Sequence, residues 1–434
     1  MKAQAAAPAA EKGTRVTDNP GPLRGGVPVL IGSLIAIYSI SQFLRNSIGV
    51  IANDLARELD LSATEVGLLS SAFFLAFAAA QIPVGIAIDR YGPKRTMLAS
   101  AAICVAGTAL FAFAESSATL IGARAMMGLG CSSLFMAPLT IYARRFPPER
   151  FAFLASLQVG IGSAGTLIAT APLAGAAADI GWRASFAAVA ALTAAFAVMV
   201  LALVPDDTTR RDRRETWREA LAGVAAATRR PSFWRVFLAH GTSYASFATI
   251  IGLWAGPWLT DVHGADLEMR GSLLLIGAVA QMLGVFAWAY ADRFFRSYKR
   301  SVLLAGSLSA ALLAAAAVLP LTLLGAAVWL ALFGFTVAYG PIVTSHGKSL
   351  FPPELTGRGI TLMNIGTMGG VFVFQSGTGA LVDLVGRNPA GGYSAASYAA
   401  VFLVMATGLA ASLIPYARAA DLHPSHGHMS YAKK

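Results

Sequence analysis

The sequence predicts an all-α polytopic membrane protein, because of its apolar content, its low charge and the length of its apolar runs. Of its 434 residues, 56% are hydrophobic and only 13% are charged, whereas soluble domains are about a quarter charged. A membrane-spanning helix needs about 20 mostly apolar residues, so twelve spans would use about 240. This composition excludes a soluble enzyme, a coiled coil or a disordered chain as the main body.

Twelve apolar stretches, each bounded by charged or turn residues, are the candidate spans. Helices are the expected spanning form, because strand-like alternation of apolar and polar residues is scarce. The first six spans are expected near 27–52, 64–88, 96–114, 118–142, 152–178 and 184–204. The last six are expected near 233–259, 270–291, 301–319, 321–345, 360–383 and 396–416.

The basic residues predict the orientation of these spans. If the N-terminus is inside, 27 of the 33 Lys and Arg residues fall on the inner side, and only Arg57, Arg183, Arg270 and Arg387 fall on the outer side. Basic residues accumulate in cytoplasmic loops, so we expect both termini in the cytoplasm and the protein in a bacterial inner (plasma) membrane. This distribution also explains the net charge of +11 without a nucleic-acid partner.

The chain repeats itself at an offset of about 204 residues. This duplication predicts two six-helix halves, 27–204 and 233–416, that pack about an axis along the membrane normal with a substrate site between them. Residues 1–26 are expected to be a disordered cytoplasmic tail, and 417–434 a second one. The recurring motifs are Asp89-Arg90-Tyr91 with Asp292-Arg293-Phe294, Phe146-Pro147-Pro148-Glu149 with Phe351-Pro352-Pro353-Glu354, and Gly175 and Asp179 with Gly379 and Asp383.

The segment between the halves, 205–232, is rich in arginine and carries Trp217, Leu221 and Val224 at helical spacing. This pattern is typical of an amphipathic connector that lies on the anionic inner leaflet. A helix that docks a partner protein is the alternative.

The run from Gly85 to Arg95, between the second and third spans, resembles the signature loop of the major facilitator superfamily. The resemblance extends to the twelve spans and the duplication, and it implies the major facilitator fold. In that family this loop latches the cytoplasmic ends of the two halves together in the outward-open state. Trp288 replaces the glycine in the second copy, which predicts a weaker latch there. The implied cytoplasmic gate consists of Gly85, Asp89, Arg90, Arg95, Asp292 and Arg293.

A finer resemblance is to the anion:cation symporter branch of that superfamily. It rests on Phe43-Leu44-Arg45-Asn46, Leu61-Ser62 and Gln81-Ile82-Pro83-Val84-Gly85. That branch moves small organic anions, and an arginine at the position of Arg45 helps to bind the substrate's carboxylate. Two carboxylates that the branch uses for proton coupling are replaced here by Leu44 and Cys131, so the resemblance does not carry its coupling mechanism.

The interiors of the predicted spans contain two arginines, Arg45 and Arg124, but no Asp or Glu in mid-span. A charge within the membrane is costly and usually functional. Arg45 shares one helix face with Tyr38 and Gln42, and it either binds substrate or extends to the outer interface. Arg124 either completes an anion site or bonds a backbone carbonyl and holds helices together.

His240 and His346 are either proton carriers for coupling, since histidine titrates near neutral pH, or hydrogen-bonded packing residues. In the superfamily, spans 1, 4, 7 and 10 line the central cavity. Each polar residue in the apolar spans is also a candidate for an interhelical hydrogen bond. The expected substrate-binding residues are Tyr38, Gln42, Arg45, Asn46, Arg124, His240, Tyr244, Tyr339, Asn364 and Gln375.

These observations predict a monomeric secondary transporter of a small, anionic or polar metabolite that works by alternating access, with a proton or sodium ion as a possible coupling partner. An exporter of drug-like amphipathic compounds is the first alternative, suggested by the span-5 pattern around Pro172. A transporter of neutral solutes and a non-transporting receptor on the same fold are further alternatives. No enzyme activity or cofactor is expected. No metal site is expected either, because Cys104 and Cys131 show no metal-ligand spacing.

Overall fold

The computed structural model describes residues 26–206, 217–352, 355–386 and 392–421. Within these ranges, twelve helical segments are long and apolar enough to cross a membrane. The predicted all-α architecture with twelve spans is therefore confirmed. The expected N-terminal tail up to residue 25, and the expected C-terminal tail beyond residue 421, lie outside the described residues.

The first half is built from α1 to α9. Its first span is longer than expected, because the helix resumes after Ser47 and ends at Glu58 instead of near residue 52. The helices are α1 (Gly26–Asn46), α2 (Ile48–Glu58), α3 (Ala63–Tyr91), α4 (Pro93–Ala112), α5 (Ser117–Cys131), α6 (Met136–Arg145), α7 (Pro148–Gly162), α8 (Ala164–Ile168) and α9 (Ala171–Leu203).

The second half follows the linker helix α10 (Trp217–Thr228). Its first span contains a π-helical turn, η1, between α11 and α12. The elements are α11 (Phe233–Thr249), η1 (Ile250–Trp254), α12 (Ala255–His263), α13 (Leu267–Phe295), α14 (Tyr298–Val318), α15 (Leu323–Val337), α16 (Gly340–Ser349), α17 (Thr356–Val385) and α18 (Ala395–Ala417).

Helix starts are set by residues that satisfy the first free N–H groups. Ser62 and Glu65 form a reciprocal capping box at the start of α3. Ser116 and Ser394 accept hydrogen bonds at the starts of α5 and α18. Gly92, at a φ of 88°, makes the tight turn from α3 into α4 that a side chain would strain.

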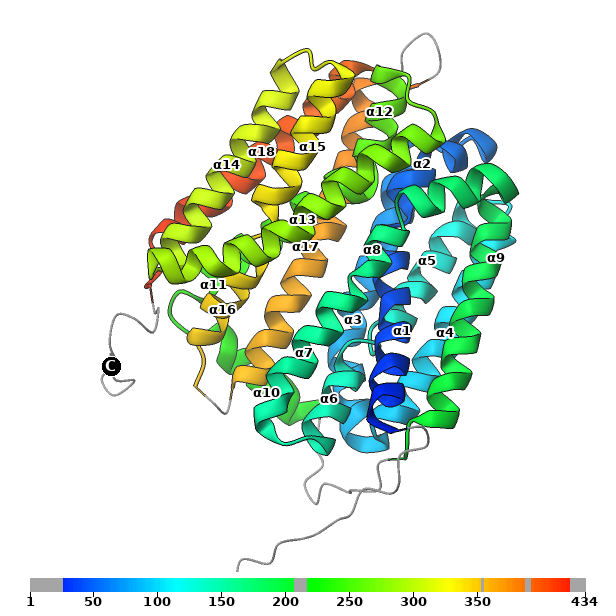
Figure 1. The fold of residues 1–434 in the computed structure, drawn as a ribbon. Helices are drawn as coiled ribbons and strands as arrows, with labels where there is room; N and C mark the ends of the chain where they lie inside the picture. Colours follow the sequence, from blue (N-terminus) through cyan, green and yellow to red (C-terminus); the bar gives the residue numbers. More distant parts are fainter. Residues whose placement is uncertain (1–25, 207–216, 353–354, 387–391, 422–434) are drawn as a thin grey trace, which may run out of the picture.

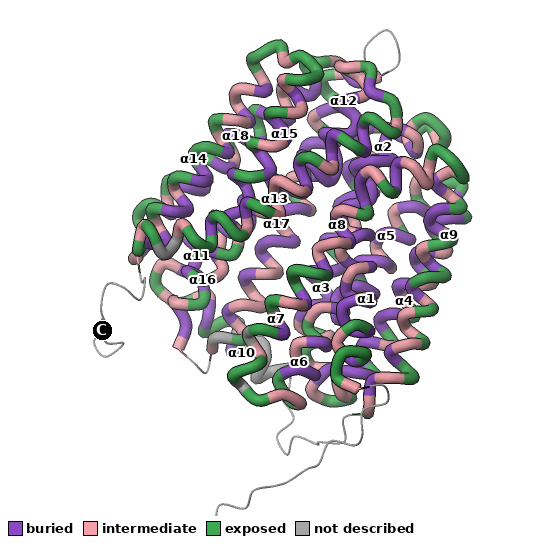
Figure 2. Tube along the Cα trace, in the orientation of Figure 1, coloured by how far each residue is buried: buried purple, intermediate pink, exposed green. Residues whose placement is uncertain are grey.

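Two ends of the bundle can be distinguished in Figure 1. We call the end that carries α2 and α12, which contact each other, the convergent end. The opposite end carries α6 and the linker helix α10, and we call it the linker end. Buried residues gather between the helices, and exposed ones lie along their outer sides (Figure 2). Exposed apolar side chains on α9, such as Leu192, Val198 and Leu201, suit contact with lipid hydrocarbon.

The same glycine contact holds two helices together in each half. A Cβ on Gly128 of α5 would lie 2.0 Å from the carbonyl oxygen of Phe73 on α3. In the second half, a Cβ on Gly334 of α15 would lie 2.3 Å from the carbonyl oxygen of Gly277 on α13. Small residues are used in this way to bring membrane helices into close contact. The predicted duplication is thus visible in the packing as well as in the loops.

We expect Gly128→Ala to lower the thermal unfolding midpoint of the purified protein, because overpacking costs about 1–3 kcal/mol. Gly122→Ala on the same helix is the matched control, because a Cβ there has no neighbour within 4 Å. That control should keep or slightly raise the midpoint, since Ala is a better helix former than Gly. Equal midpoints for both variants would contradict the packing role of Gly128.

Candidate functional site

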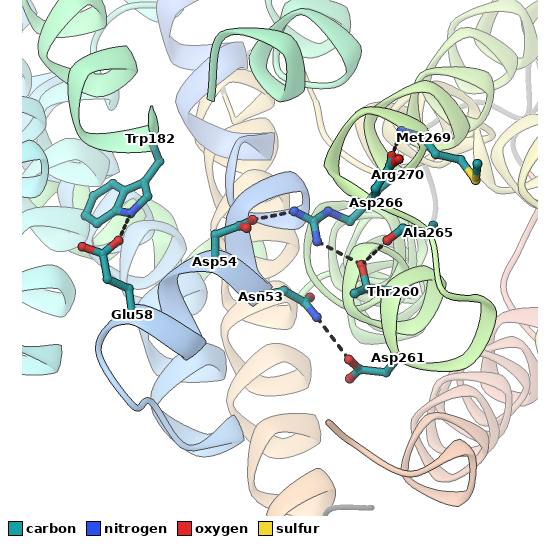
Figure 3. Close-up of polar contacts among 10 residues, drawn as sticks. All are labelled: Asn53, Asp54, Glu58, Trp182, Thr260, Asp261, Ala265, Asp266, Met269 and Arg270. Carbon is teal, nitrogen blue, oxygen red and sulfur yellow. Dashed lines mark hydrogen bonds and ion pairs between the residues drawn. The ribbon is translucent and has the colours of Figure 1, made fainter. Parts of the chain in front are cut away.

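The two halves are joined at the convergent end by an ion pair (Figure 3). Arg270 of α13 donates to Asp54 of α2 over 2.5 Å and to the Thr260 hydroxyl over 2.9 Å. The Arg270 side chain is 3% exposed and that of Asp54 is 39% exposed. A buried guanidinium needs a partner, so Arg270 ties its own half to the first half through Asp54.

A second contact between the halves lies beside the first. Asn53 of α2 donates to Asp261 of α12 over 3.2 Å. The same carboxylate accepts from the backbone N–H of Tyr393 over 3.0 Å and from the Tyr398 hydroxyl over 2.6 Å. Asp261 therefore fixes α12 within the second half and holds α2 of the first half at the same point.

A third contact is made by the carboxylate of Asp383, near the end of α17. It accepts from the backbone N–H groups of Ala63 and Thr64 over 2.9 and 2.7 Å, and from the Thr64 hydroxyl over 2.5 Å. A carboxylate at a helix N-terminus is stabilised by the free N–H groups and the helix dipole. Here the helix is α3 of the other half, so this cap also crosses between the halves.

Glycines bring the backbones of the two halves into direct contact at this end. A Cβ on Gly49 would lie 2.6 Å from the carbonyl oxygen of Ile251, and one on Gly256 would lie 1.8 Å from that of Gly49. A Cβ on Gly67 would lie 2.6 Å from the carbonyl oxygen of Gln375. No side chain separates the halves at these points, so the convergent end is closed.

Arg45 lies further along the interface between the halves, near the middle of the first span. About 13 helical residues, or roughly 20 Å, separate it from Glu58 at the convergent end. Its guanidinium lies over the ring of Phe77 on α3, 4.9 Å from the centroid, and within electrostatic range of the Tyr244 side chain on α11. This position inside the bundle does not match a side chain that extends to the outer interface.

Arg45, Tyr244, Tyr38 and Gln42 form a cluster that we call the Arg45 chamber. The hydroxyls of Tyr38 and Tyr244 both lie within electrostatic range of the Arg45 guanidinium. Among the described residues, Nε of Arg45 and Oε1 of Gln42 are buried and have no hydrogen-bond partner, although both residues keep some exposed surface. The chamber thus contains one positive charge and unused polar atoms, and both halves contribute to it.

Arg124, the second arginine within the spans, is fully buried in the first half. It donates to the carbonyl oxygen of Leu44 over 2.6 Å and lies over the ring of Phe73, 4.8 Å from the centroid. Of the two roles expected for it, the structure shows the bond to a carbonyl that holds helices together. Because Leu44 precedes Arg45, this bond also positions the chamber arginine.

Two other predicted site residues make hydrogen bonds that hold helices. Asn46 donates to the carbonyl oxygen of Gln42 over 2.9 Å and to the Thr166 hydroxyl over 3.3 Å. Gln375 donates to the carbonyl oxygen of Ala248 over 3.0 Å. Asn46 therefore contacts the backbone of one chamber residue, Gln42, whereas the Gln375 bond lies outside the Arg45 chamber.

The two histidines lie within the second half, and both ring nitrogens of each have partners. His240 bridges the hydroxyls of Thr344 and Thr367, at 2.9 and 2.5 Å. It therefore links α11 to α16 and α17.

His346 lies toward the linker end, where its ring nitrogens contact the Tyr416 hydroxyl and the Ala420 carbonyl oxygen, both at 2.8 Å. Tyr339 is fully buried, and its hydroxyl lies 3.2 Å from the Cβ position of Gly306. Asn364 on α17 is partly exposed. None of these three belongs to the contacts of the Arg45 chamber.

The signature loop between α3 and α4 makes ion pairs within its own half. Asp89 pairs with Arg144 over 3.7 Å, and Lys94 pairs with Asp206 over 3.7 Å. Arg90 lies over the ring of Tyr91, 5.4 Å from the centroid. Two further gate residues, Gly85 and Arg95, are exposed. The side chains of Asp292 and Arg293, which complete the predicted cytoplasmic gate, lie outside the described part.

The contacts at the convergent end are functional features that the sequence analysis did not identify. Asp54 and Asp261 appeared only as acidic residues outside the mid-span regions, and Asp383 appeared only as part of a repeated motif. Their partners are up to about 320 positions away in the chain, and no local pattern signals such a contact. The one available signal was the repeat, which marked Asp383 without showing its partner. No sequence pattern marked Phe77 either, although its ring lies under the Arg45 guanidinium.

Comparison with known proteins identifies the family of this chain. The family model described as Major Facilitator Superfamily matches residues 34–375. The chain is 26% identical, over 382 residues, to a protein described as the probable sulfoacetate transporter SauU of Cupriavidus necator, covering 82% of this chain and 85% of that one. It is 24% identical, over 378 residues, to the hexuronate transporter of Bacillus subtilis, covering 82% and 86%. A shorter match, 29% identical over 205 residues, is to the efflux pump mlcE of Penicillium citrinum, covering 46% and 36%.

Solved structures with the same fold include the nucleoside transporter NupG, with a TM-score of 0.71 and 11% identity over 89% of this chain and 98% of that one. A bacterial homologue of the human lysosomal transporter Spinster, in an inward-facing and occupied conformation, gives a TM-score of 0.67 and 18% identity over 90% and 95%. At these identities the similarity shows the fold alone.

We expect Asp54→Ala to lower the stability of the purified protein by roughly 3 kcal/mol, because it leaves the buried charge of Arg270 without a partner. This is the lower end of the range for a buried pair, since Asp54 is 39% exposed. Thermal unfolding in detergent measures the loss.

Glu58→Ala is the comparison variant within the first half. Glu58 pairs with Arg183 at the surface, where the two side chains are 46% and 35% exposed, and it also accepts from the Trp182 indole over 2.5 Å. An exposed pair contributes about 1 kcal/mol or less. The double variant Asp54→Ala with Arg270→Ala should recover part of the Asp54→Ala loss, because it removes the orphaned charge. Equal losses for Asp54→Ala and Glu58→Ala would contradict a buried bridge between the halves.

Proposed function

The chain belongs to the major facilitator superfamily and is a multi-pass membrane transporter, and we propose that it moves a small organic anion by alternating access. The observation that carries this proposal is the Arg45 chamber. It contains an arginine near the middle of the membrane, beside an aromatic face and two tyrosine hydroxyls. An anionic substrate would supply the counter-charge that the chamber does not contain.

The guanidinium group suits a particular class of substrate. It donates in a planar fork to two oxygens at once, and this geometry fits carboxylates and other oxyanions. Sulfoacetate and hexuronate, which are named for the two relatives matched over 82% of this chain, are both oxyanions of this kind. These names support an oxyanion substrate and leave open which one it is.

The proposal also implies which side of the membrane each end of the bundle faces. The distribution of basic residues favours a cytoplasmic position for the linker end, so the closed convergent end would face outward. Arg45 keeps some exposed surface although the convergent end is closed. This combination corresponds to an inward-facing state. Reaching the outward-facing state would require breaking the Asp54–Arg270 and Asn53–Asp261 contacts, and substrate binding would shift the balance between the two states.

Export of amphipathic drug-like compounds is the second candidate function. The partial similarity to a fungal efflux pump favours it, and so does the pattern at the start of α9, where Pro172 lies in the first turn. An exporter of this kind would respond to amphipathic compounds whether or not Arg45 carries a charge. The two functions therefore differ in their dependence on one residue.

The test is a thermal-shift screen of the purified protein with carboxylates, sulfonates, neutral sugars and amphipathic drugs. The screen is run at two pH values, with and without sodium, to test whether a proton or a sodium ion takes part in binding. We expect oxyanions to raise the unfolding midpoint, since a ligand that binds only the folded state stabilises it. Stabilisation by amphipathic drugs alone would favour export, and stabilisation by neutral sugars alone would contradict an anion site.

We expect Arg45→Gln to abolish both the oxyanion-induced shift and saturable oxyanion uptake into proteoliposomes, because it removes the charge and the fork. Arg45→Lys keeps the charge without the fork and should lose at least tenfold in affinity, about 1.4 kcal/mol. Arg57→Gln, at an exposed position near the convergent end, is the control for general loss of positive charge. Uptake by Arg45→Gln with unchanged apparent affinity would show that Arg45 is not the anchor.

We expect Tyr244→Phe to weaken oxyanion binding by about tenfold, or about 1.4 kcal/mol, with little change in the unfolding midpoint of the ligand-free protein. This variant removes only the hydroxyl that the second half presents to Arg45. Titration of the thermal shift measures the affinity. Unchanged binding would mean that the second half does not contribute to the site through this residue.

A further inference from the structure

A deep apolar groove lies on the first half, away from the Arg45 chamber. Its volume is about 820 Å³, and it is lined by α3, α4 and α5. The lining includes small residues, among them Ala79 on α3 and Ala99 on α4, and also Leu129 of α5. All three of these residues are exposed in the bundle, so in a membrane-spanning protein the groove opens to the lipid.

The polar part of the groove lies toward the linker end. There Tyr91 and Arg95 belong to the lining. Arg95 is exposed and makes no hydrogen bond or ion pair with any described residue, whereas the neighbouring Lys94 is paired with Asp206. The stretch of α3 from Ala76 to Tyr91 is about 22 Å long at the helical rise. One leaflet of the hydrocarbon core is about 15 Å thick, so the groove spans a leaflet from Arg95 inward.

The second half carries larger residues at the corresponding positions, counted from the first residue of each helix. Leu283 on α13 and Leu304 on α14 occupy the positions of Ala79 and Ala99. Phe335 occupies the position of Leu129, and its carbonyl oxygen accepts from the Trp288 indole over 2.9 Å. The small residues of the groove are therefore a feature of the first half and not of the duplicated fold.

We propose that this groove binds one anionic phospholipid of the bilayer, with an acyl chain along α3 and α4 and the phosphate on Arg95. The apolar walls match an acyl chain. The exposed Arg95 guanidinium, which has no hydrogen-bond or ion-pair partner within the described part of the chain, matches a phosphate oxygen pair. A zwitterionic lipid would fill the same walls but gain less at Arg95, because a basic residue near the surface favours anionic headgroups.

The test is native mass spectrometry of the full chain, purified in mild detergent and titrated with phosphatidylglycerol or with phosphatidylcholine of the same acyl chains. We expect one phosphatidylglycerol to be retained in preference to phosphatidylcholine. Arg95→Gln should reduce phosphatidylglycerol retention about fivefold, the effect of one basic residue near an anionic surface, and should leave phosphatidylcholine retention unchanged.

Three further variants separate this site from general lipid adsorption. Arg300→Gln is the matched control, because Arg300 occupies the position of Arg95 in the second half, where larger residues replace Ala79 and Ala99; it should retain lipid like the unmodified protein. Ala79→Leu combined with Ala99→Leu copies the residues of the second half and should reduce retention of both lipids. If this pair fails to fold, Ala99→Leu alone tests the same point.

The outcomes are distinct. Equal retention of the two lipids by the unmodified protein would overturn the anionic specificity. Equal losses in Arg95→Gln and Arg300→Gln would show only diffuse attraction between basic residues and lipid. Full retention by a folded, groove-filled variant would show that the groove is not the binding site. Oxyanion transport is not part of any of these readouts, so the result is independent of the proposed substrate.

Discussion

Arg45 carries its charge near the middle of the first span, where the surroundings provide an aromatic ring and tyrosine hydroxyls but no carboxylate. The ring of Phe77 stabilises a guanidinium through its negative face, and the Tyr244 hydroxyl lies within electrostatic range of it. These contacts offset only part of the desolvation cost of a full charge. The surrounding bundle holds this charge in place. Arg124 donates to the carbonyl oxygen of Leu44, the residue before Arg45, and residues of both halves surround the chamber.

The contacts between the halves differ in kind along the interface. At the convergent end they are carboxylates bonded to a guanidinium, an amide and backbone N–H groups, with glycines allowing direct backbone contact. Around Arg45 the residues keep some exposure and unsatisfied polar atoms. The carboxylates thus hold the halves together at the convergent end, and none of these carboxylates pairs with Arg45.

Much of the fold could be predicted from the sequence, because hydropathy, the basic-residue distribution and the repeat are local or periodic signals. Arg45 could be singled out because an arginine inside an apolar run is rare. The end of the first span could not be predicted, since Asn53, Asp54 and Glu58 look like loop residues although they form the polar turns of α2. The partners of Arg124, His240 and Asp383 depend on how distant helices meet, and hydropathy contains no information about that.

The seventh span contains an irregular turn between Tyr244 and the contacts of the convergent end. The π-helical turn η1 interrupts the α-helix between Tyr244 and Asp261, and it packs against Gly49 of α2 in the first span. A π turn leaves the backbone ladder less regular than an α-helix does. The seventh span is therefore less regular between Tyr244 and the contacts of the convergent end. A change of backbone angles at this turn would move α12, with Asp261, relative to Tyr244 without unfolding either flanking helix.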